Sequence, residues 1–178
     1  ILEKGGTLEV QGPVSPFILV SGEVTGNAVV QGYADILDRL APGDAIGQMT
    51  IEDKLSFGSQ SHLQIEVDRN ELGERNDRIT VGGRVSLRGQ LEIAPRPGYQ
   101  DPADAGSFDR FEFMTMPRRV GAFAAISFDG SPLTFQYETI TQRRSHVGEG
   151  LFRSIVYDND SITWIHYRAI PGDADGNG

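Results

Sequence analysis

The three histidines are the side chains best suited to acid–base or metal chemistry, but their positions do not group them. His62, His146 and His166 lie far apart, and no two are separated by the two or four residues that place ligands on one strand or helix face. An isolated histidine is more often a surface or half-buried structural residue than a metal ligand. We therefore expect no histidine-based metal or catalytic site.

Serines and carboxylates also lack a catalytic pattern. No serine stands in the Gly-x-Ser-x-Gly context of a hydrolase nucleophile. Carboxylates are adjacent at Glu52-Asp53, and Glu66 and Asp68 share one face of an expected strand. Glycosidases need two carboxyl groups about 5–10 Å apart across a cleft, which spacing along the chain does not establish. We expect no catalytic residues and predict that the chain is not an enzyme.

Arginines and aromatic residues offer a binding chemistry instead. The doublets Arg118-Arg119 and Arg143-Arg144 could meet a sulfated or uronic polysaccharide, although such doublets are also common in solvated turns. Aromatic rings can stack on sugars, but core packing is the more frequent role. The candidates are Tyr99, Tyr137, Tyr157, Trp164 and Tyr167.

Composition limits the partners. The chain has 178 residues, 16 basic and 25 acidic side chains, and a formal charge of −9, which argues against nucleic-acid binding. No apolar run approaches the length that spans a bilayer, so we expect no membrane insertion. The absence of cysteine removes disulfides and thiolate metal sites.

The elements that would position these residues are predicted to be short strands. Polar and apolar residues alternate with period two, and glycines separate the alternating segments. The alternation predicts one shared core containing Leu63, Ile65, Val67, Ile79, Val81, Val85, Leu87, Leu91 and Ile93.

The pattern changes along the chain. Residues 1–94 form a glycine-punctuated part, residues 95–107 a proline-rich loop, and residues 108–170 a more aromatic part with strands expected at 108–114, 122–128, 133–140, 152–158 and 161–168. We predict an all-β fold in which a short β-solenoid, similar to a parallel β-helix, is capped by an antiparallel sheet. A β-sandwich is the alternative. Residues 35–40 fit one or two helical turns or a strand equally well.

A succession of short motifs between about residues 38 and 170 resembles a known class of region. A proline–glycine turn at 42–43 is followed by Leu63-Gln-Ile-Glu66, by Gly89-Gln-Leu-Glu-Ile93 and by Val120-Gly-Ala-Phe123. This order is similar to the C-terminal region of large exported bacterial proteins with autotransporter-type β-helical passengers. Asp44 and Ala45 depart from that pattern, where serine or asparagine is usual. The resemblance implies a secreted or cell-surface stalk or spacer without an active site.

The last residues, 171–178, resemble the opening of a dockerin-type calcium loop, which is EF-hand-like. Such a loop uses oxygen ligands at positions 1, 3 and 5 and a glycine at position 6, and Asp173, Asp175, Asn177 and Gly178 match those places. The acidic ligand at position 12 would lie beyond residue 178. The resemblance implies that this chain holds no cofactor by itself, and that Ca²⁺ binds in a longer chain with the loop complete.

These observations predict a non-catalytic structural, spacer or adhesion module of a large exported bacterial protein. Its partners would be neighbouring domains of the parent chain. The alternatives are a carbohydrate-binding module that touches a cell-surface glycan and, less favoured, part of a β-helical polysaccharide lyase. The lyase would require more solenoid coils than residues 1–93 can supply.

Overall fold

The protein is an all-β chain in a computed structural model that describes residues 6–9, 12–14, 18–20, 22–43, 45–70 and 73–171. These ranges contain strands and turns and no helix, as the alternation predicted. The helical alternative for residues 35–40 is wrong, because two strands run through this segment with a bend at residues 37–38.

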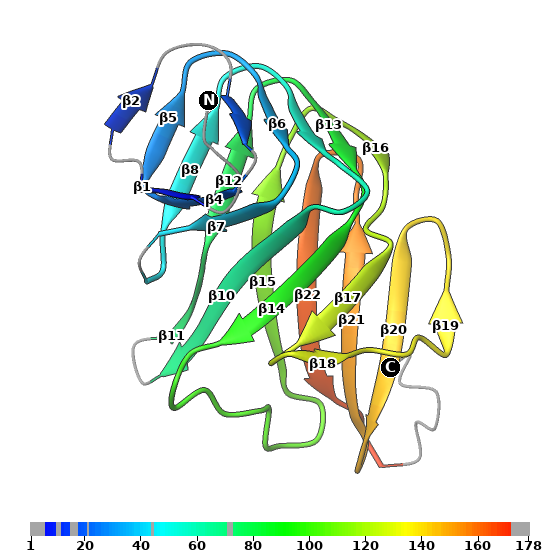
Figure 1. The fold of residues 1–178 in the computed structure, drawn as a ribbon. Coiled ribbons are helices and arrows are strands. Elements are labelled where there is room, and N and C mark those ends of the chain that lie inside the picture. Colours follow the sequence, from blue (N-terminus) through cyan, green and yellow to red (C-terminus); the bar gives the residue numbers. More distant parts are fainter. Residues whose placement is uncertain are drawn as a thin grey trace.

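The described residues form three sheets, named A, B and C here (Figure 1). Sheet A contains β1 (Gly6–Glu9), β4 (Gly22–Gly26), β7 (Arg39–Pro42), β10 (His62–Asn70), β14 (Gln90–Pro95), β17 (Ala125–Phe128) and β18 (Ser131–Pro132), with β11 (Gly73–Asn76) paired to β10. Sheet B contains β2 (Gly12–Val14), β5 (Ala28–Val30), β8 (Gln48–Ile51), β12 (Arg78–Val81), β15 (Phe108–Thr115), β22 (Ser161–Arg168), β21 (Leu151–Tyr157), β20 (Gln142–Gly148) and β19 (Tyr137–Glu138). Sheet C contains β3 (Ile18–Val20), β6 (Ala34–Ile36), β9 (Leu55–Phe57), β13 (Arg84–Leu87) and β16 (Arg118–Gly121).

The chain visits sheets A, B and C in turn, and each visit adds a parallel strand beside the one from the previous coil. This is the predicted β-solenoid. Because the pairing is parallel and in register, like residues stack on like residues. One such stack crosses sheet A through Val24, Leu40, Leu63, Leu91 and Ile126. All nine residues predicted to share the core belong to one buried cluster.

Successive coils lengthen along the chain. Gly6 pairs with Gly22, Glu23 with Arg39, Arg39 with His62, His62 with Gln90 and Gln90 with Ala125, so the spacing per coil is 16, 16, 23, 28 and 35 residues. The step from 16 to 23 comes from the longer connections after β7 and after β9. The later steps come from the longer β10 and β15, from the excursion through β11 and from the loop after β14. Variable coil length explains why the repeat is irregular in the sequence.

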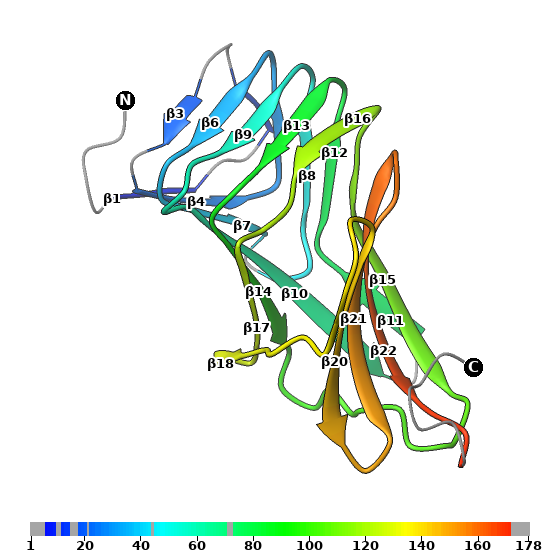
Figure 2. The ribbon, with the colours of Figure 1, turned by 90° about the vertical axis from the view of Figure 1, so that its right-hand side faces the viewer.

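The coils lengthen from the narrow end, at β1 to β3, to the wide end, at β15 to β17. The wide end of the solenoid is closed by an antiparallel sheet, as predicted. β15 pairs parallel with β12 on one side and antiparallel with β22 on the other, and β21, β20 and β19 continue sheet B. These strands lie opposite β14 and β17 of sheet A (Figure 2). Large side chains fill the space between them, including the fully buried Phe111, Phe113, Phe123, Tyr157 and Trp164.

Two parts of the predicted strand pattern differ from the structure. β16 and β17 are not part of an antiparallel meander, because they pair parallel with β13 and β14 and continue the solenoid past the proline-rich loop. The strand expected at residues 133–140 is reduced to β19, whereas β20 was not predicted. β20 lacks apolar alternation because its inward residues are Arg143 and Ser145, and Arg143 donates to the Phe123 carbonyl.

Glycines at the coil corners are explained by close approach between coils. A Cβ atom on Gly82 would lie 2.2 Å from the Glu52 carbonyl oxygen of the preceding coil. Gly89 has a positive φ of 66°, and a Cβ there would lie 2.2 Å from the Ser61 carbonyl oxygen. No side chain fits at these corners, so the sequence needs glycine there.

Candidate functional site

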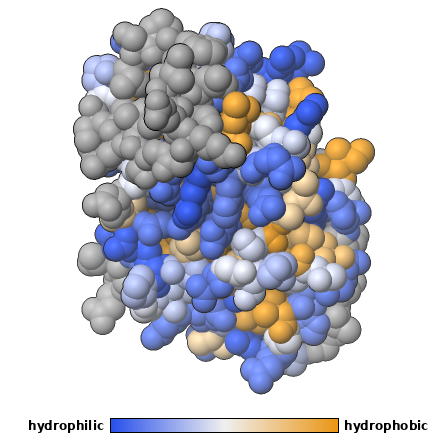
Figure 3. All heavy atoms as spheres, in the orientation of Figure 1, coloured by the Kyte–Doolittle hydropathy of each residue, from blue (hydrophilic) through white to orange (hydrophobic). Residues whose placement is uncertain are grey.

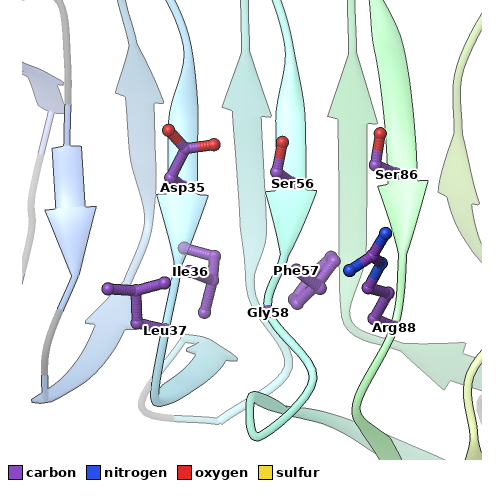
Figure 4. A pocket seen from close by; sticks show the side chains of 8 residues that line it. All are labelled: Asp35, Ile36, Leu37, Ser56, Phe57, Gly58, Ser86 and Arg88. Carbon is purple, nitrogen blue, oxygen red and sulfur yellow. The ribbon is translucent and has the colours of Figure 1, made fainter.

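A surface groove crosses the outer face of sheet C. It has a volume of about 350 Å³ and is lined by Asp35, Ile36, Leu37, Ser56, Phe57, Gly58, Ser86 and Arg88. Asp35, Ser56 and Ser86 occupy equivalent positions on β6, β9 and β13, and they form a polar row (Figure 4). Leu37 and Arg88 lie on either side of Gly58, where the missing side chain leaves the hollow (Figure 4).

The groove offers hydrogen-bonding groups, the negative charge of Asp35 and the positive charge of Arg88. Its hydroxyls and the Asp35 carboxylate can bond to polar groups, and the 48% exposed Leu37 supplies an apolar flank. The three histidines contact residues outside this lining, so the groove contains no histidine–serine pair. No pattern in the sequence predicted the groove, because its polar row forms only when three coils align.

The outer face of sheet A carries ion pairs. Arg39 Nε lies 3.1 Å from Glu23 Oε1, and Arg96 bonds to Glu66. His62 Nε2 lies 3.4 Å from Glu92 Oε2, but burial lowers the pKa of His62, so this contact is not an ion pair at neutral pH. The middle of the face over this sheet is largely hydrophilic (Figure 3). Partly exposed pairs of this kind contribute at most about 1 kcal/mol each, so they mainly keep the face solvated.

A buried polar network occupies the wide end between sheets A and B. Arg69 of β10 lies 3.1 Å from Asp109 of β15, and the Tyr99 hydroxyl donates to the same carboxylate at 3.0 Å. Tyr99 Oη is also 3.0 Å from Nδ1 of His166, whose Nε2 accepts from Arg153 Nε at 3.3 Å. The Asp109 and His166 side chains are fully buried.

The donors in this network fix the state of the histidine. Arginine can only donate, so Nε2 of His166 carries no proton. The proton is then on Nδ1 and is donated to Tyr99, whose own hydroxyl proton goes to Asp109. Burial, followed by the nearby Arg153 and further arginines, lowers the pKa of His166 to about 3, so the ring stays neutral. Burial also raises the pKa of Tyr99.

The network holds elements together. Tyr99 lies in the loop between β14 and β15, and Arg168 Nε donates to the carbonyl of Pro102 in the same loop at 2.8 Å. Arg153 also packs over the Phe128 ring at 3.6 Å, which joins sheet B to sheet A. Because both nitrogens of His166 are bonded and its side chain is buried, the arrangement suits structural cohesion better than proton transfer to a substrate. His166 was expected to be at most half-buried, and that is wrong.

A second buried carboxylate lies at a coil corner. Asp77, between β11 and β12, accepts the backbone N–H groups of Gly47 and Glu66, each at 2.7 Å. Burial raises the pKa of Asp77 to about 7, and the two N–H donors oppose that rise. The carboxylate links the turn before β8 to β10, so its role is also structural.

The aromatic residues that were candidates for stacking on sugar rings differ in their burial. Trp164 and Tyr157 are buried and Tyr99 belongs to the network, whereas the side chain of Tyr137 is outside the described set. Tyr167 faces the outside of sheet B, opposite to Trp164 and His166, as the alternation predicted.

The two arginine doublets approach each other around Tyr157. Arg119 lies over the Tyr157 ring at 4.8 Å. Burial raises the pKa of Tyr157 to about 12, and the nearby Arg143 and Arg119 oppose that rise. Arg143 is also paired with Glu138 at 2.7 Å. Arg118 is exposed, and Arg144 lies over Tyr167 at 5.9 Å. The doublets therefore do not form one continuous cationic surface.

The predicted calcium ligands Asp173, Asp175 and Asn177 lie outside the described residues. Within the described residues, no group of three or more histidine or carboxylate side chains could hold a metal ion. A helix long and apolar enough to cross a membrane is likewise not found in that part of the chain. No family model matches the chain, and no curated protein matches it in sequence.

Proposed function

We propose that the chain is a non-catalytic structural or adhesion module of a large secreted or cell-surface bacterial protein, in which it closes a β-solenoid. The observation that supports this role is the difference between the two ends of the stack. At the wide end, antiparallel strands and large aromatic side chains fill the opening. At the narrow end, sheets A, B and C all terminate in the first coil, at β1, β2 and β3.

The narrow end is a template for further coils. Within the described ranges, no strand pairs with the outer edges of β1, β2 and β3. Parallel edges of this kind accept another strand through backbone hydrogen bonds, and solenoid coils stabilise one another through nearest-neighbour contacts. In the proposed role these edges receive coils from the parent protein, which is the neighbouring-domain partner that the sequence predicted.

A coil-duplication experiment tests this role. Residues 22–37 are copied directly ahead of Gly6, which reproduces the 16-residue spacing between Gly6 and Gly22. The added coil should form strands, protect its amides from hydrogen exchange and raise the unfolding temperature. The control carries the same sixteen residues in an order without polar–apolar alternation. An added segment as unprotected as the control, with an equal unfolding temperature, would contradict the proposal.

The calcium prediction belongs to the same proposal. Ca²⁺ needs six to eight oxygen ligands, and Asp173, Asp175 and Asn177 provide half a loop. Calorimetric titration should detect no tight binding by residues 1–178 and tight binding by a parent chain with a complete loop. Equal absence of binding in both chains would remove the dockerin-like segment from the proposal and leave the solenoid role to the duplication test.

A further inference from the structure

A row of basic side chains crosses the outer face of sheet C. The register pairs Arg84 of β13 with Arg118 of β16, and Val85 with Leu55, so Lys54 lies beside Arg84 immediately before β9. Leu55 and Val85 are buried, and period-two alternation therefore directs Lys54 and Arg84 outward. Adjacent strands are about 4.8 Å apart, so the row presents positive charges at intervals of about 5 Å. The strands that carry the row lie side by side in Figure 2.

The basic groups of this face are available to a ligand. Arg84, Arg118 and a third arginine, Arg88, are exposed. Across the described ranges of the chain, no hydrogen bond, ion pair or ring contact engages these three guanidinium groups. Lys54 lies over the Tyr33 ring at 4.9 Å, and its ammonium group makes no hydrogen bond to the described residues. An anionic ligand therefore has no existing ion pair to displace.

Hydroxyl groups lie between the basic row and Arg88. One pleat along from the basic row, Asp35, Ser56 and Ser86 form the polar row of the groove (Figure 4). Each of these three residues is partly exposed, so the described chain leaves this face open. Beside the polar row, Gly58 contributes no side chain to the hollow of about 350 Å³. The face therefore combines hydroxyl groups with positive charge on both sides of them.

The face is positive in an acidic chain. The described strands of sheet C contribute one carboxylate, Asp35, against the four basic groups. Further carboxylates, at Asp38, Glu52 and Asp53, lie at the coil corners beyond the strand ends. Because the whole chain has a formal charge of −9, this local excess of positive charge directs an anionic partner to sheet C.

We propose that the outer face of sheet C binds an acidic polysaccharide with uronic carboxylates. The guanidinium groups of Arg84, Arg88 and Arg118 bond to the carboxylates in the two-pronged geometry that arginine favours, and the polar row bonds to the sugar hydroxyls. A uronic polymer supplies both kinds of group. An acidic polypeptide lacks the ring hydroxyls, and a heavily sulfated glycan has few of them free.

This site goes beyond the proposed structural role, since a spacer that closes a solenoid requires no ligand. It also differs from the sequence-based carbohydrate hypothesis. That hypothesis relied on stacked aromatic rings and on the two arginine doublets, whereas this site uses no ring and only Arg118 of the doublets.

Affinity electrophoresis in gels with immobilised polygalacturonate tests this proposal, with neutral dextran as the reference polymer. Each mobility is measured relative to a gel without polymer, which removes the effect of a changed protein charge. The wild-type chain should be retarded by polygalacturonate and not by dextran, and added salt should weaken the retardation. Arg84→Gln and Arg118→Gln should each weaken binding about threefold or more. Both positions are exposed, so these variants should keep the wild-type unfolding temperature.

Arg78→Gln is the matched control, because it removes an exposed arginine from the outer face of sheet B. This variant should bind polygalacturonate like the wild type. Absence of retardation, equal retardation by dextran, or equal weakening by Arg78→Gln would overturn the proposal.

Competition with soluble polymers at equal charge tests the class of ligand. Soluble polygalacturonate should release the wild-type chain from the gel better than polyglutamate or dextran sulfate does. Competition by polyglutamate at least as strong as that by polygalacturonate would assign the face to an acidic protein. The same result with dextran sulfate would assign it to a sulfated glycan, and either outcome would overturn the proposal.

Discussion

The solenoid coils and the closed end solve the same packing problem differently. In the coils, each residue stacks on its equivalent in the next coil, so aliphatic side chains such as Leu63 and Leu91 are sufficient. At the closed end the repeat stops and sheet B continues as antiparallel strands, so the core is filled by the large side chains of Trp164, Phe111 and Phe113. Coils that repeat one register can be packed with side chains of matching size. The end where the repeat stops needs individual large side chains to fill its core.

The two regions also satisfy their buried charges differently. In the coils, the Asp77 carboxylate is bonded by backbone N–H groups, which every coil supplies. At the closed end, Asp109 is bonded by the side chains of Arg69 and Tyr99. The closed end therefore depends on particular residues, and it should be more sensitive to single substitutions than the coils.

Truncation of core residues should give the largest effects. Trp164→Ala should lower the free energy of unfolding by about 3–5 kcal/mol, and Leu87→Ala, inside a repeated stack, by about 2–5 kcal/mol. Denaturant titration of both variants measures the difference. A cost below half a kcal/mol for Leu87→Ala would mean that coil register contributes little to packing.

Removal of the network carboxylate should have the next largest effect. Asp109→Asn leaves the Arg69 guanidinium without its charged partner, which should cost about 3 kcal/mol. Glu23→Gln, at a partly exposed ion pair on sheet A, is the matched control and should cost at most about 1 kcal/mol. Equal costs in chemical denaturation would show that the network is no more important than the surface pairs.

Substitution of a corner glycine should have an intermediate effect. Gly89→Ala combines a positive φ with a clash against the preceding coil, so it should cost about 2–3 kcal/mol. Gly130→Ala has a similar φ of 70° but open space around the new methyl group, and it should cost about 1 kcal/mol. The difference in unfolding temperature between the two variants reports the clash alone. Equal unfolding temperatures would contradict tight contact between coils at Gly89.

The pH dependence should give the smallest net effect, because two buried groups act in opposite directions. The pKa of His166 is about 3 in the fold and about 6.5 when unfolded, so its contribution to stability is lost as pH falls from about 6.5 to 3. The pKa of Asp77 is about 7 in the fold and about 3.9 when unfolded, so its contribution is lost as pH rises from about 4 to 7.

Single variants separate the two titrations. Relative to wild type, Asp77→Asn should make the stability rise more steeply with pH, since the effect of His166 remains. His166→Gln should make the stability fall between about pH 4 and 7, since the effect of Asp77 remains. Unfolding midpoints measured at several pH values give both slopes, and unchanged slopes would contradict the shifted pKa values.

The sequence predicted the coils better than the closed end. Alternation and glycine spacing identified the strands and the shared core, because each coil obeys the same local rules. β20 was not predicted because Arg143 and Ser145 occupy its inward positions, so the strand lacks polar–apolar alternation. The partner of Arg143 is the Phe123 carbonyl, which lies in a distant segment. The groove over Gly58 and the buried network depend on register between strands far apart in the chain. No spacing along one strand could reveal them.

The lengthening of the coils has a consequence for how the chain reaches its fold. Closing a coil of 35 residues costs only slightly more chain entropy than closing one of 16, because the cost grows with the logarithm of length. The longer strands bury more surface in return, so nucleation should favour the wide end. That nucleus includes β22, which ends at Arg168. During synthesis the coils of the narrow end emerge before β22, so they can pack onto that nucleus only after the residues up to Arg168 have been made.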